Sequence, residues 1–170
     1  MKKTCFIIAG ANGAGKSTFA EAFLPHEVNC FYFVNADMIA KGISPFRPKN
    51  SRLEAGKILF RKIEEYSNNG ITFAFESTLS GTGHLRRIES LKKKGYRIII
   101  YYIRLVSDEL AVERVKCRVK EGGHNVPEID IRRRFTRSWQ NFTKLYRNLA
   151  DEWIVFDNSG DEPIMLERSL

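Results

Sequence analysis

The feature that most constrains this chain is the stretch IIAGANGAGKSTF at positions 7–19, in which an apolar run is followed by three glycines, a lysine and two hydroxyl residues. It contains the pattern G-x-x-x-x-G-K-S, which begins at Gly10 and ends with Gly15, Lys16 and Ser17. Glycines let backbone N–H groups turn toward anionic oxygens, and the helix that follows presents its positive end to them. The stretch is therefore typical of a loop that cradles the phosphates of a nucleotide.

The chemistry of this loop assigns roles to its residues. In such loops the lysine reaches the outer phosphates and the serine is a Mg²⁺ ligand, so we expect Lys16 at a solvent-facing place and Ser17 at the metal. An ordinary Gly-rich turn is the alternative. The flanks favour the phosphate loop, because residues 4–9 have the pattern of a buried strand and residues 16–24 that of a helix ending before Pro25. The nine residues of the loop are Gly10, Ala11, Asn12, Gly13, Ala14, Gly15, Lys16, Ser17 and Thr18.

Composition narrows the class of protein. The 170 residues suit a single domain over 1–170, and 43% of them are hydrophobic, enough for a core without covalent support. We interpret three widely spaced cysteines, Cys5, Cys30 and Cys117, as reduced packing residues of a cytoplasmic protein, because they form no disulfide or zinc pattern. No apolar run is long enough for a signal peptide or a bilayer span, so we expect no membrane partner.

Apolar segments alternate with helical patterns along the chain, which predicts an α/β fold. Helical spacing covers residues 51–66 and 84–94, and Ser107 is placed to cap a further helix. Together with the phosphate loop, this order predicts a P-loop NTPase fold like that of nucleoside monophosphate kinases, with a five-stranded, mostly parallel sheet and helices on both faces. The expected strands are residues 4–9, 31–35, 71–76, 97–105 and 152–160.

Acidic and hydroxyl residues follow three of these strands, where ligands of parallel sheets bind. A carboxylate there can hold Mg²⁺ or accept a proton from an attacking hydroxyl. The position of Asp37 suits a base on the acceptor side, with a helix cap as the alternative, whereas for Asp157 we favour a turn cap. Glu76 stands where many P-loop proteins carry an aspartate for the metal or its water shell, which leaves its role open. The Ser77 and Thr78 hydroxyls can bind the acceptor or satisfy loop amides.

The net charge of +8 is concentrated over residues 114–147, where ten lysines and arginines accompany three acids. Two basic helices, the second opening with Arg132, Arg133 and Arg134, are joined by Gly122-Gly123. We interpret residues 107–150 as an arginine-rich lid with a packing helix, with a solvated pair of basic helices as the alternative. Such a lid brings guanidinium groups to the transferring phosphoryl group and excludes water. The candidate phosphate contacts are Arg114, Arg118, Arg133 and Arg134, and Arg118 is assigned to the catalytic set with Lys16 and Asp37.

A run of apolar residues in the second basic helix repeats at helical spacing, and we interpret it as core packing. Two of its aromatic residues, Trp139 and Phe142, would form a base-stacking platform only if they were exposed. The run is Ile131, Phe135, Trp139, Phe142, Tyr146 and Leu149.

Several segments resemble the zeta toxin family of small P-loop kinases: GANGAGKST, NADMIA, FESTLSG and, above all, GGHNVP with the RRRF that follows it. The similarity extends over residues 3–159. It implies ATP-dependent phosphorylation of a hydroxyl, which in the toxin members lies on UDP-N-acetylglucosamine, and it implies an antitoxin-like protein as a candidate partner. GGHNVP places His124 about where those toxins have a lid arginine, so the choice among the four lid arginines stays open.

The resemblance also implies roles for single residues. Asp37 is the general base, and Glu76 and Thr78 contact the acceptor. Lys16 and Ser17 serve ATP and Mg²⁺.

A nucleic-acid partner is the rival interpretation of the basic helices. It corresponds to a polynucleotide 5′-hydroxyl kinase or an RNA-binding P-loop ATPase. A small-acceptor kinase should close its arginines over a pocket, whereas a strand binder needs an open basic groove and a salt-sensitive affinity. We favour the kinase that uses ATP and a small hydroxyl-bearing acceptor, and we expect no nucleic-acid partner.

Overall fold

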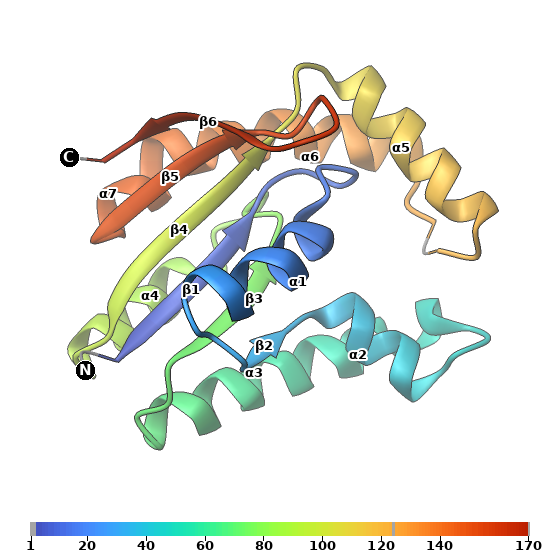
Figure 1. Ribbon diagram of the computed structural model, residues 1–170. Coiled ribbons are helices and arrows are strands. Elements are labelled where there is room, and N and C mark those ends of the chain that lie inside the picture. Colours follow the sequence, from blue (N-terminus) through green and yellow to red (C-terminus); the bar gives the residue numbers. More distant parts are fainter. Residues whose placement is uncertain (1–2, 124, 170) are drawn as a thin grey trace.

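The computed structural model describes residues 3–123 and 125–169, and Figure 1 shows helices packed around one sheet. The strands are β1 (Thr4–Ala9), β2 (Phe33–Val34), β3 (Phe73–Ser77), β4 (Arg97–Arg104), β5 (Glu152–Asp157) and β6 (Ile164–Arg168). The helical elements are α1 (Lys16–Glu27), α2 (Ala36–Ile43), the 3₁₀ turn η1 (Pro48–Ser51), α3 (Arg52–Asn68), α4 (Leu85–Lys93), α5 (Asp108–Lys120), α6 (Glu128–Asn141), the π-helical turn η2 (Phe142–Tyr146) and α7 (Arg147–Leu149). Among the described residues, no helix is long and apolar enough to cross a bilayer.

The sheet has the order β2-β3-β1-β4-β5-β6, and its first five strands are parallel. The central strand β1 is apolar and buried after its first residue, as expected of a parallel strand covered on both faces. Side chains of α3, α4 and η2 cover one face, and side chains of α1 and α5 cover the other. The predicted α/β fold, with a mostly parallel sheet between helices, is confirmed.

The sixth strand, β6, was not among the five expected strands. It pairs antiparallel with β5 at the edge of the sheet, and all five of its residues are exposed. Its sequence, IMLER, places apolar side chains next to one another instead of alternating them with polar ones. Because β6 buries no side chain, backbone pairing with β5 forms it, and the apolar pattern carries no signal for it.

Helix α1 extends past Pro25 to Glu27, which corrects the expectation that it ends before the proline. Proline lacks an N–H group, so it removes one backbone hydrogen bond from a helix. Here that loss falls in the last turn, and the chain is closed by a 2.8 Å hydrogen bond from the Cys30 N–H to the Leu24 carbonyl. The proline therefore marks the last turn of α1 and not its boundary.

Two further boundaries differ from those expected. Only Phe33 and Val34 of the segment 31–35 pair in β2, since Phe31 stands 73% exposed and Asn35 is already the N-cap of α2. Helix α6 begins at Glu128, one turn before Arg132. Its first turn carries Glu128 and Asp130, which interact favourably with the positive end of a helix.

The apolar run of the second basic helix is core packing, as predicted. Three of its members are buried and three are partly buried, and they divide between the hydrophobic clusters on the two faces of the sheet. The buried ones are Ile131, Phe142 and Tyr146, and the partly buried ones are Phe135, Trp139 and Leu149.

Two of the three cysteines are packing residues. Cys5 and Cys30 are buried, whereas Cys117 lies exposed on α5, which corrects the interpretation of that residue. Its place on a surface position of an amphipathic helix means that the core does not require it.

The carboxyl ends of β1, β2 and β3 bring distant segments together. The phosphate loop follows β1, Asn35 follows β2, and Glu76 is the fourth residue of β3. In the register of β1 and β3, Ile8 lies opposite Glu76 and Ala9 opposite Ser77. Glu76 therefore lies beside the end of the strand that leads into the phosphate loop.

Candidate active site

The phosphate loop is held between two other elements of the fold. Gly13 has a φ of 80°, and a Cβ at this position would lie 2.5 Å from the Ala111 carbonyl oxygen in α5. On the other side, the Asn158 amide donates a 2.8 Å hydrogen bond to the Ala14 carbonyl. Both the backbone conformation and the close approach of α5 require glycine at position 13. The loop is thus shaped by packing before any phosphate binds.

Lys16 is buried, with 6% of its side chain exposed, which corrects the expectation of a solvent-facing lysine. Its Nζ donates a 2.9 Å hydrogen bond to the Ala11 carbonyl and lies 3.5 Å from Glu76 Oε1. The loop therefore wraps around its own lysine and fixes the position of the ammonium group. Removing Lys16 should disturb its neighbours as well as a bound phosphate.

Ser17 and Glu76 form a compact polar cluster with Asn35. The Ser17 hydroxyl donates to Glu76 Oε2 at 2.7 Å, and the Asn35 amide donates to the same oxygen at 2.6 Å. The amide also lies 3.2 Å from Ser17 Oγ. A hydroxyl oxygen and a carboxylate oxygen thus face each other at the start of α1, and both are oxygen ligands of the kind Mg²⁺ prefers.

Asn35 also caps the helix that carries Asp37. Its Oδ1 accepts hydrogen bonds from the backbone N–H groups of Asp37 at 2.8 Å and Met38 at 3.2 Å. The capping alternative for Asp37 is therefore wrong, because Asn35 is the N-cap of α2. An asparagine between a strand and a helix is a usual N-cap, so this part of its role was recognisable in the sequence. Its contacts with Glu76 and Ser17 cross between strands and had no local signal.

Two cavities meet at Asp37. One, of about 240 Å³, is lined by Lys16, Glu76 and Arg134, and the other, of about 520 Å³, lies between α2 and the end of α5. Asn35 and Asp37 line both. The Asp37 carboxylate makes no hydrogen bond or ion pair with any residue in 3–123 and 125–169. It is therefore accessible to a ligand from either cavity.

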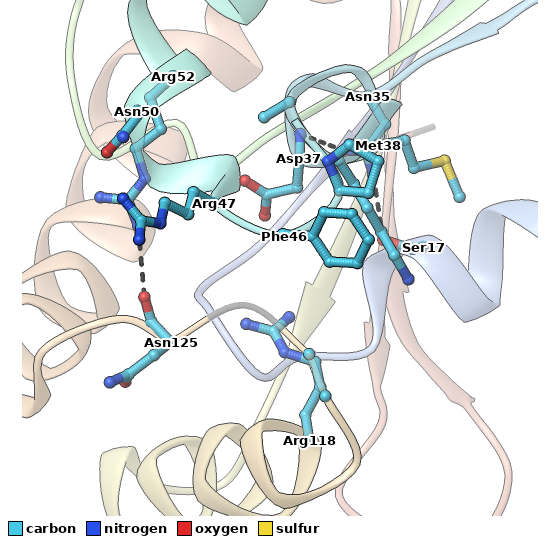
Figure 2. Close-up of a pocket in the computed structure, with 15 residues that line it drawn as sticks. Ser17, Asn35, Asp37, Met38, Phe46, Arg47, Asn50, Arg52, Arg118 and Asn125 are labelled. Carbon is cyan, nitrogen blue, oxygen red and sulfur yellow. Dashed lines mark hydrogen bonds between the residues drawn. The ribbon is translucent and has the colours of Figure 1, made fainter. Parts of the chain in front are cut away.

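Basic side chains reach the larger cavity from opposite elements. Figure 2 shows Arg47 and Arg52 on one side of it and Arg118 on the other, with Phe46 and Asp37 between them. Arg52 also donates a 3.3 Å hydrogen bond to the Asn125 carbonyl, which links the start of α3 to the segment after α5. Arg47 and Arg52 lie outside the basic segment that sequence reasoning singled out, and only the folded chain brings them to it.

The four candidate lid arginines separate into two pairs. Arg118 lines the larger cavity, and Arg134 lines the smaller one with its Nη1 3.3 Å from Asn12 Oδ1 in the phosphate loop. Arg114 instead donates to two carbonyls of the loop between β5 and β6, at 2.7 and 3.0 Å. Arg133 pairs with Asp130 at the surface. His124, the other candidate in this region, lies outside the described residues.

The hydroxyls of the two residues after Glu76 make hydrogen bonds within their own loop. Ser77 Oγ accepts from the Leu79 N–H at 3.1 Å, and Thr78 Oγ1 lies 2.9 Å from Ser80 Oγ. Ser77 and Thr78 nevertheless line the smaller cavity, so these bonds do not remove them from the reach of a ligand. Asp157 accepts from the Ser159 N–H at 2.8 Å, which is the turn cap that the sequence favoured.

The family model for zeta toxins matches residues 47–168. The match begins after the phosphate loop, so the geometry of the loop is independent support for a P-loop protein. A protein of Haemophilus influenzae described only as uncharacterized is 31% identical over 135 residues, which are 79% of this chain and 94% of that relative.

Solved structures of other proteins share the fold. A chain of the AvrRxo1-ORF1:AvrRxo1-ORF2 complex with sulfate matches 98% of this chain at 17% identity with a TM-score of 0.77, and this chain spans 58% of its length. A structure of that complex with ATP has a TM-score of 0.75 at 16% identity, with 98% of this chain and 58% of the other covered. The PezAT toxin–antitoxin system of Streptococcus pneumoniae matches with a TM-score of 0.73 at 13% identity, covering 98% and 72%. These structures support the fold, and the family model, which matches more than half of the chain, shows that this chain belongs to the zeta toxin family of P-loop kinases and is a phosphotransferase.

Proposed function

We propose that this kinase transfers the γ-phosphoryl group of ATP to a hydroxyl of an anionic small acceptor, with UDP-N-acetylglucosamine or a related nucleotide sugar as the acceptor. The observation that carries the proposal is the place of Asp37. Its unengaged carboxylate stands where the cavity at the phosphate loop meets a larger basic cavity. A base at that junction can accept the proton of a hydroxyl that approaches the γ-phosphate from the acceptor side.

The loop residues 10–18 are proposed to bind the phosphates of ATP. Lys16 supplies the charge nearest to the loop, and Arg134 approaches it from α6 through its contact with Asn12. The related AvrRxo1 complex has been solved with ATP, which supports the same nucleotide here.

The residues at the start of α1 fit a magnesium ion. Mg²⁺ bound to nucleotide phosphates usually takes only one or two protein oxygens, and Ser17 and Glu76 offer a hydroxyl and a carboxylate 2.7 Å apart. When bound there, the ion would neutralise charge on the β- and γ-phosphate oxygens. Because Glu76 contacts Ser17 directly, we assign Glu76 to the metal or its water shell. We prefer this role to the contact with the acceptor that the resemblance implied.

The larger cavity supports the anionic acceptor. Its volume of about 520 Å³ lies in the range of small-molecule sites, and four cationic side chains line it against the single carboxylate of Asp37 among the described residues. Cations in excess of acids favour a ligand that carries phosphate or carboxylate. The cationic residues are Lys41, Arg47, Arg52 and Arg118.

In the proposed reaction, the acceptor oxygen forms a bond to the γ-phosphorus while the bond from that phosphorus to the β–γ bridging oxygen breaks. The hydroxyl proton passes to a carboxylate oxygen of Asp37, and ADP leaves. Arg118 and Arg134, from the two cavities, are placed to stabilise the charge on the transferring group. Arg114 and Arg133 are proposed to support the fold of the lid instead.

The test supplies labelled ATP with purified UDP-N-acetylglucosamine and, separately, with a small-molecule cell extract. We expect transfer of label to a UDP-sugar. Label on a different component of the extract would show that the acceptor is another molecule, while the proposed kinase activity would stand. Release of inorganic phosphate alone in both reactions would contradict a kinase that acts on an acceptor.

A polynucleotide 5′-hydroxyl is the second candidate acceptor. Phe46 is 98% exposed beside Arg47 at the mouth of the larger cavity, and an exposed ring among arginines can stack on a base. A chain of the Pnkp1/Rnl/Hen1 RNA repair complex shares the fold at 23% identity with a TM-score of 0.66, over 84% of this chain and 46% of its own. Phosphorylation of a 5′-hydroxyl oligonucleotide in preference to UDP-sugars would favour this candidate.

An antitoxin-like protein remains the proposed macromolecular partner. The support is that the AvrRxo1 and PezAT relatives were each solved or characterised with a second protein. Co-purification of this kinase with a protein that blocks its transfer of label would establish the partner.

We propose that α5, the Gly122-Gly123 turn and α6 act as the lid. Gly122, with a φ of 83°, ends α5 in a left-handed conformation, and the Gly122 and Gly123 N–H groups bond back to the Val119 and Arg118 carbonyls. These are the two hydrogen bonds of a Schellman helix end. A Cβ on Gly123 would collide with Arg118 Cγ and lie 2.7 Å from the Arg118 carbonyl oxygen. The turn therefore sets the position of the arginine that faces the acceptor cavity.

Replacing Gly123 by alanine is expected to lower kcat about 10-fold, because it displaces Arg118, while ATP binding changes little. Gly122→Ala is the matched control. A Cβ on Gly122 meets no atom within 4 Å, so this change strains the backbone and lowers the melting temperature without pushing on Arg118. Turnover at saturating ATP, ATP titration and thermal unfolding separate the two effects. Equal losses of turnover and ATP affinity in a variant that carries both Gly122→Ala and Gly123→Ala would indicate that this segment is a fixed wall.

A further inference from the structure

His84 lies on the wall of the 240 Å³ cavity that also contains Asp37 and Glu76. It occupies the N-cap position of α4, where side chains usually accept a hydrogen bond from the helix, but it makes no such bond. Its ring nitrogens form no hydrogen bond with any residue of the described segments. Neither helix capping nor an internal polar contact accounts for a histidine at this place.

The imidazole ring is held between two aromatic rings. It stacks on Phe75 with centroids 5.1 Å apart and an interplanar angle of 29°, and it meets Phe60 edge-on at 5.9 Å. The Arg87 guanidinium lies over the Phe60 ring, 3.7 Å from its centroid. The orientation of the imidazole is therefore fixed before a ligand enters the cavity.

The two ring nitrogens differ in their surroundings. Nδ1 is enclosed by protein without a hydrogen-bond partner, and because His84 lines the cavity, we assign the other nitrogen, Nε2, to the contact with a ligand there. Burial, with a smaller effect from Arg87, lowers the pKa of His84 to about 4, so the ring is neutral at pH 7. A neutral imidazole adds no charge to a cavity that already holds Lys16 and Glu76.

The fold alone would be served better by an apolar ring. Phenylalanine would keep both aromatic contacts and would avoid the unfavourable burial of a nitrogen without a partner. The imidazole is thus explained by a ligand that uses its accessible nitrogen.

We propose that His84 is a specificity-determining residue that hydrogen-bonds, through Nε2, a hydroxyl of the acceptor where the acceptor extends past Asp37 from the larger cavity into the smaller one. The inference rests on the proposed acceptor kinase and adds a residue that selects its acceptor. A hydroxyl suits a neutral imidazole in either tautomer, because it can donate to a bare nitrogen or accept from an N–H group.

The experiment compares His84→Phe, which keeps the aromatic stack, with His84→Gln, which restores a polar group. Each variant receives labelled ATP with UDP-N-acetylglucosamine and with the small-molecule extract, at acceptor levels below and above the KM. His26→Phe is the matched control, because His26 is exposed on α1 and lines none of the cavities described above. Thermal unfolding of every variant is measured in parallel.

We expect His84→Phe to lower kcat/KM for the acceptor about 10-fold with the KM for ATP unchanged and the melting temperature kept or raised. His84→Gln should recover part of the loss, and His26→Phe should match the parent protein. Equal acceptor kinetics in His84→Phe and the parent would overturn the inference while leaving the kinase in place. If the parent protein labels no acceptor in either mixture, the proposed function fails and this inference fails with it.

Discussion

Replacing Asp37 by asparagine is expected to lower turnover by about 10²-fold or more, with ATP affinity nearly unchanged. The substitution keeps the size of the side chain but removes the oxygen that would accept the acceptor's proton. Asn35 caps α2 in this structure, and the Asp37 carboxylate has no partner among the described residues, so no structural contact is lost. Turnover is measured with saturating ATP and the acceptor that the labelling experiment identifies.

Glu54→Gln is the matched control for this substitution. Glu54 is an exposed acid in the first turn of the neighbouring helix α3, and it lines neither cavity at Asp37. If Asp37→Asn keeps more than about a third of the parent turnover, the loss is far smaller than a general base provides, and Asp37 is not the base. If its turnover recovers fully at high Mg²⁺, Asp37 serves the metal instead.

The parallel sheet and the phosphate loop could be predicted because their signals are local. The strand over residues 4–9 is an unbroken apolar run, and its bounds agree with β1. The capping role of Ser107 was likewise readable, and its hydroxyl accepts from the Leu110 N–H at 3.3 Å. Each of these features depends on residues within a few positions of one another. The edge strand β6 had no such signal, because backbone pairing with β5 is its main support.

The sequence could not predict which candidate site residues face a cavity and which make structural contacts, because contacts between distant segments decide this. Arg114 and Arg118 lie one turn apart on α5, but Arg114 binds carbonyls 44 and 45 residues away, whereas Arg118 faces a cavity. Asn35 hydrogen-bonds Ser17 and Glu76, which lie 18 and 41 residues away from it in the sequence. The sequence could identify which residue types carry chemistry, but their pairing depends on how α5 and the strand ends pack.

The burial of Lys16 belongs to the same class of long-range effect. Lysines are rarely buried without a partner, and here the Ala11 carbonyl and Glu76 provide two. The second partner comes from β3, whose neighbour in the sheet is the strand that leads into the phosphate loop. The lysine therefore has a structural contact that a motif match does not reveal, and this contact changes what its removal should do.

Substitution of Lys16 by methionine is expected to reduce phosphoryl transfer by about 10²- to 10³-fold, since loss of one preorganised charge at a transferring group typically has this effect. Methionine keeps most of the apolar stem in its buried place, so it disturbs packing less than alanine would. Some stability should still be lost, about 1–3 kcal/mol, because Glu76 Oε1 loses its cation. The cost stays limited because Ser17 and Asn35 continue to donate to Glu76 Oε2.

The double variant Lys16→Met with Glu76→Gln separates catalysis from folding. Glutamine removes the carboxylate charge that Lys16→Met leaves without its cation, so the double variant should unfold at a higher temperature than Lys16→Met alone. Its turnover should stay as low as that of the single variant or fall further, because neither change returns a cation to the phosphate loop. Thermal unfolding, ATP titration and label transfer on the same preparations test both statements. A folded Lys16→Met protein with near-parent turnover would contradict the assignment of this loop to the phosphates of ATP, since the only cation that the loop itself supplies would then be dispensable.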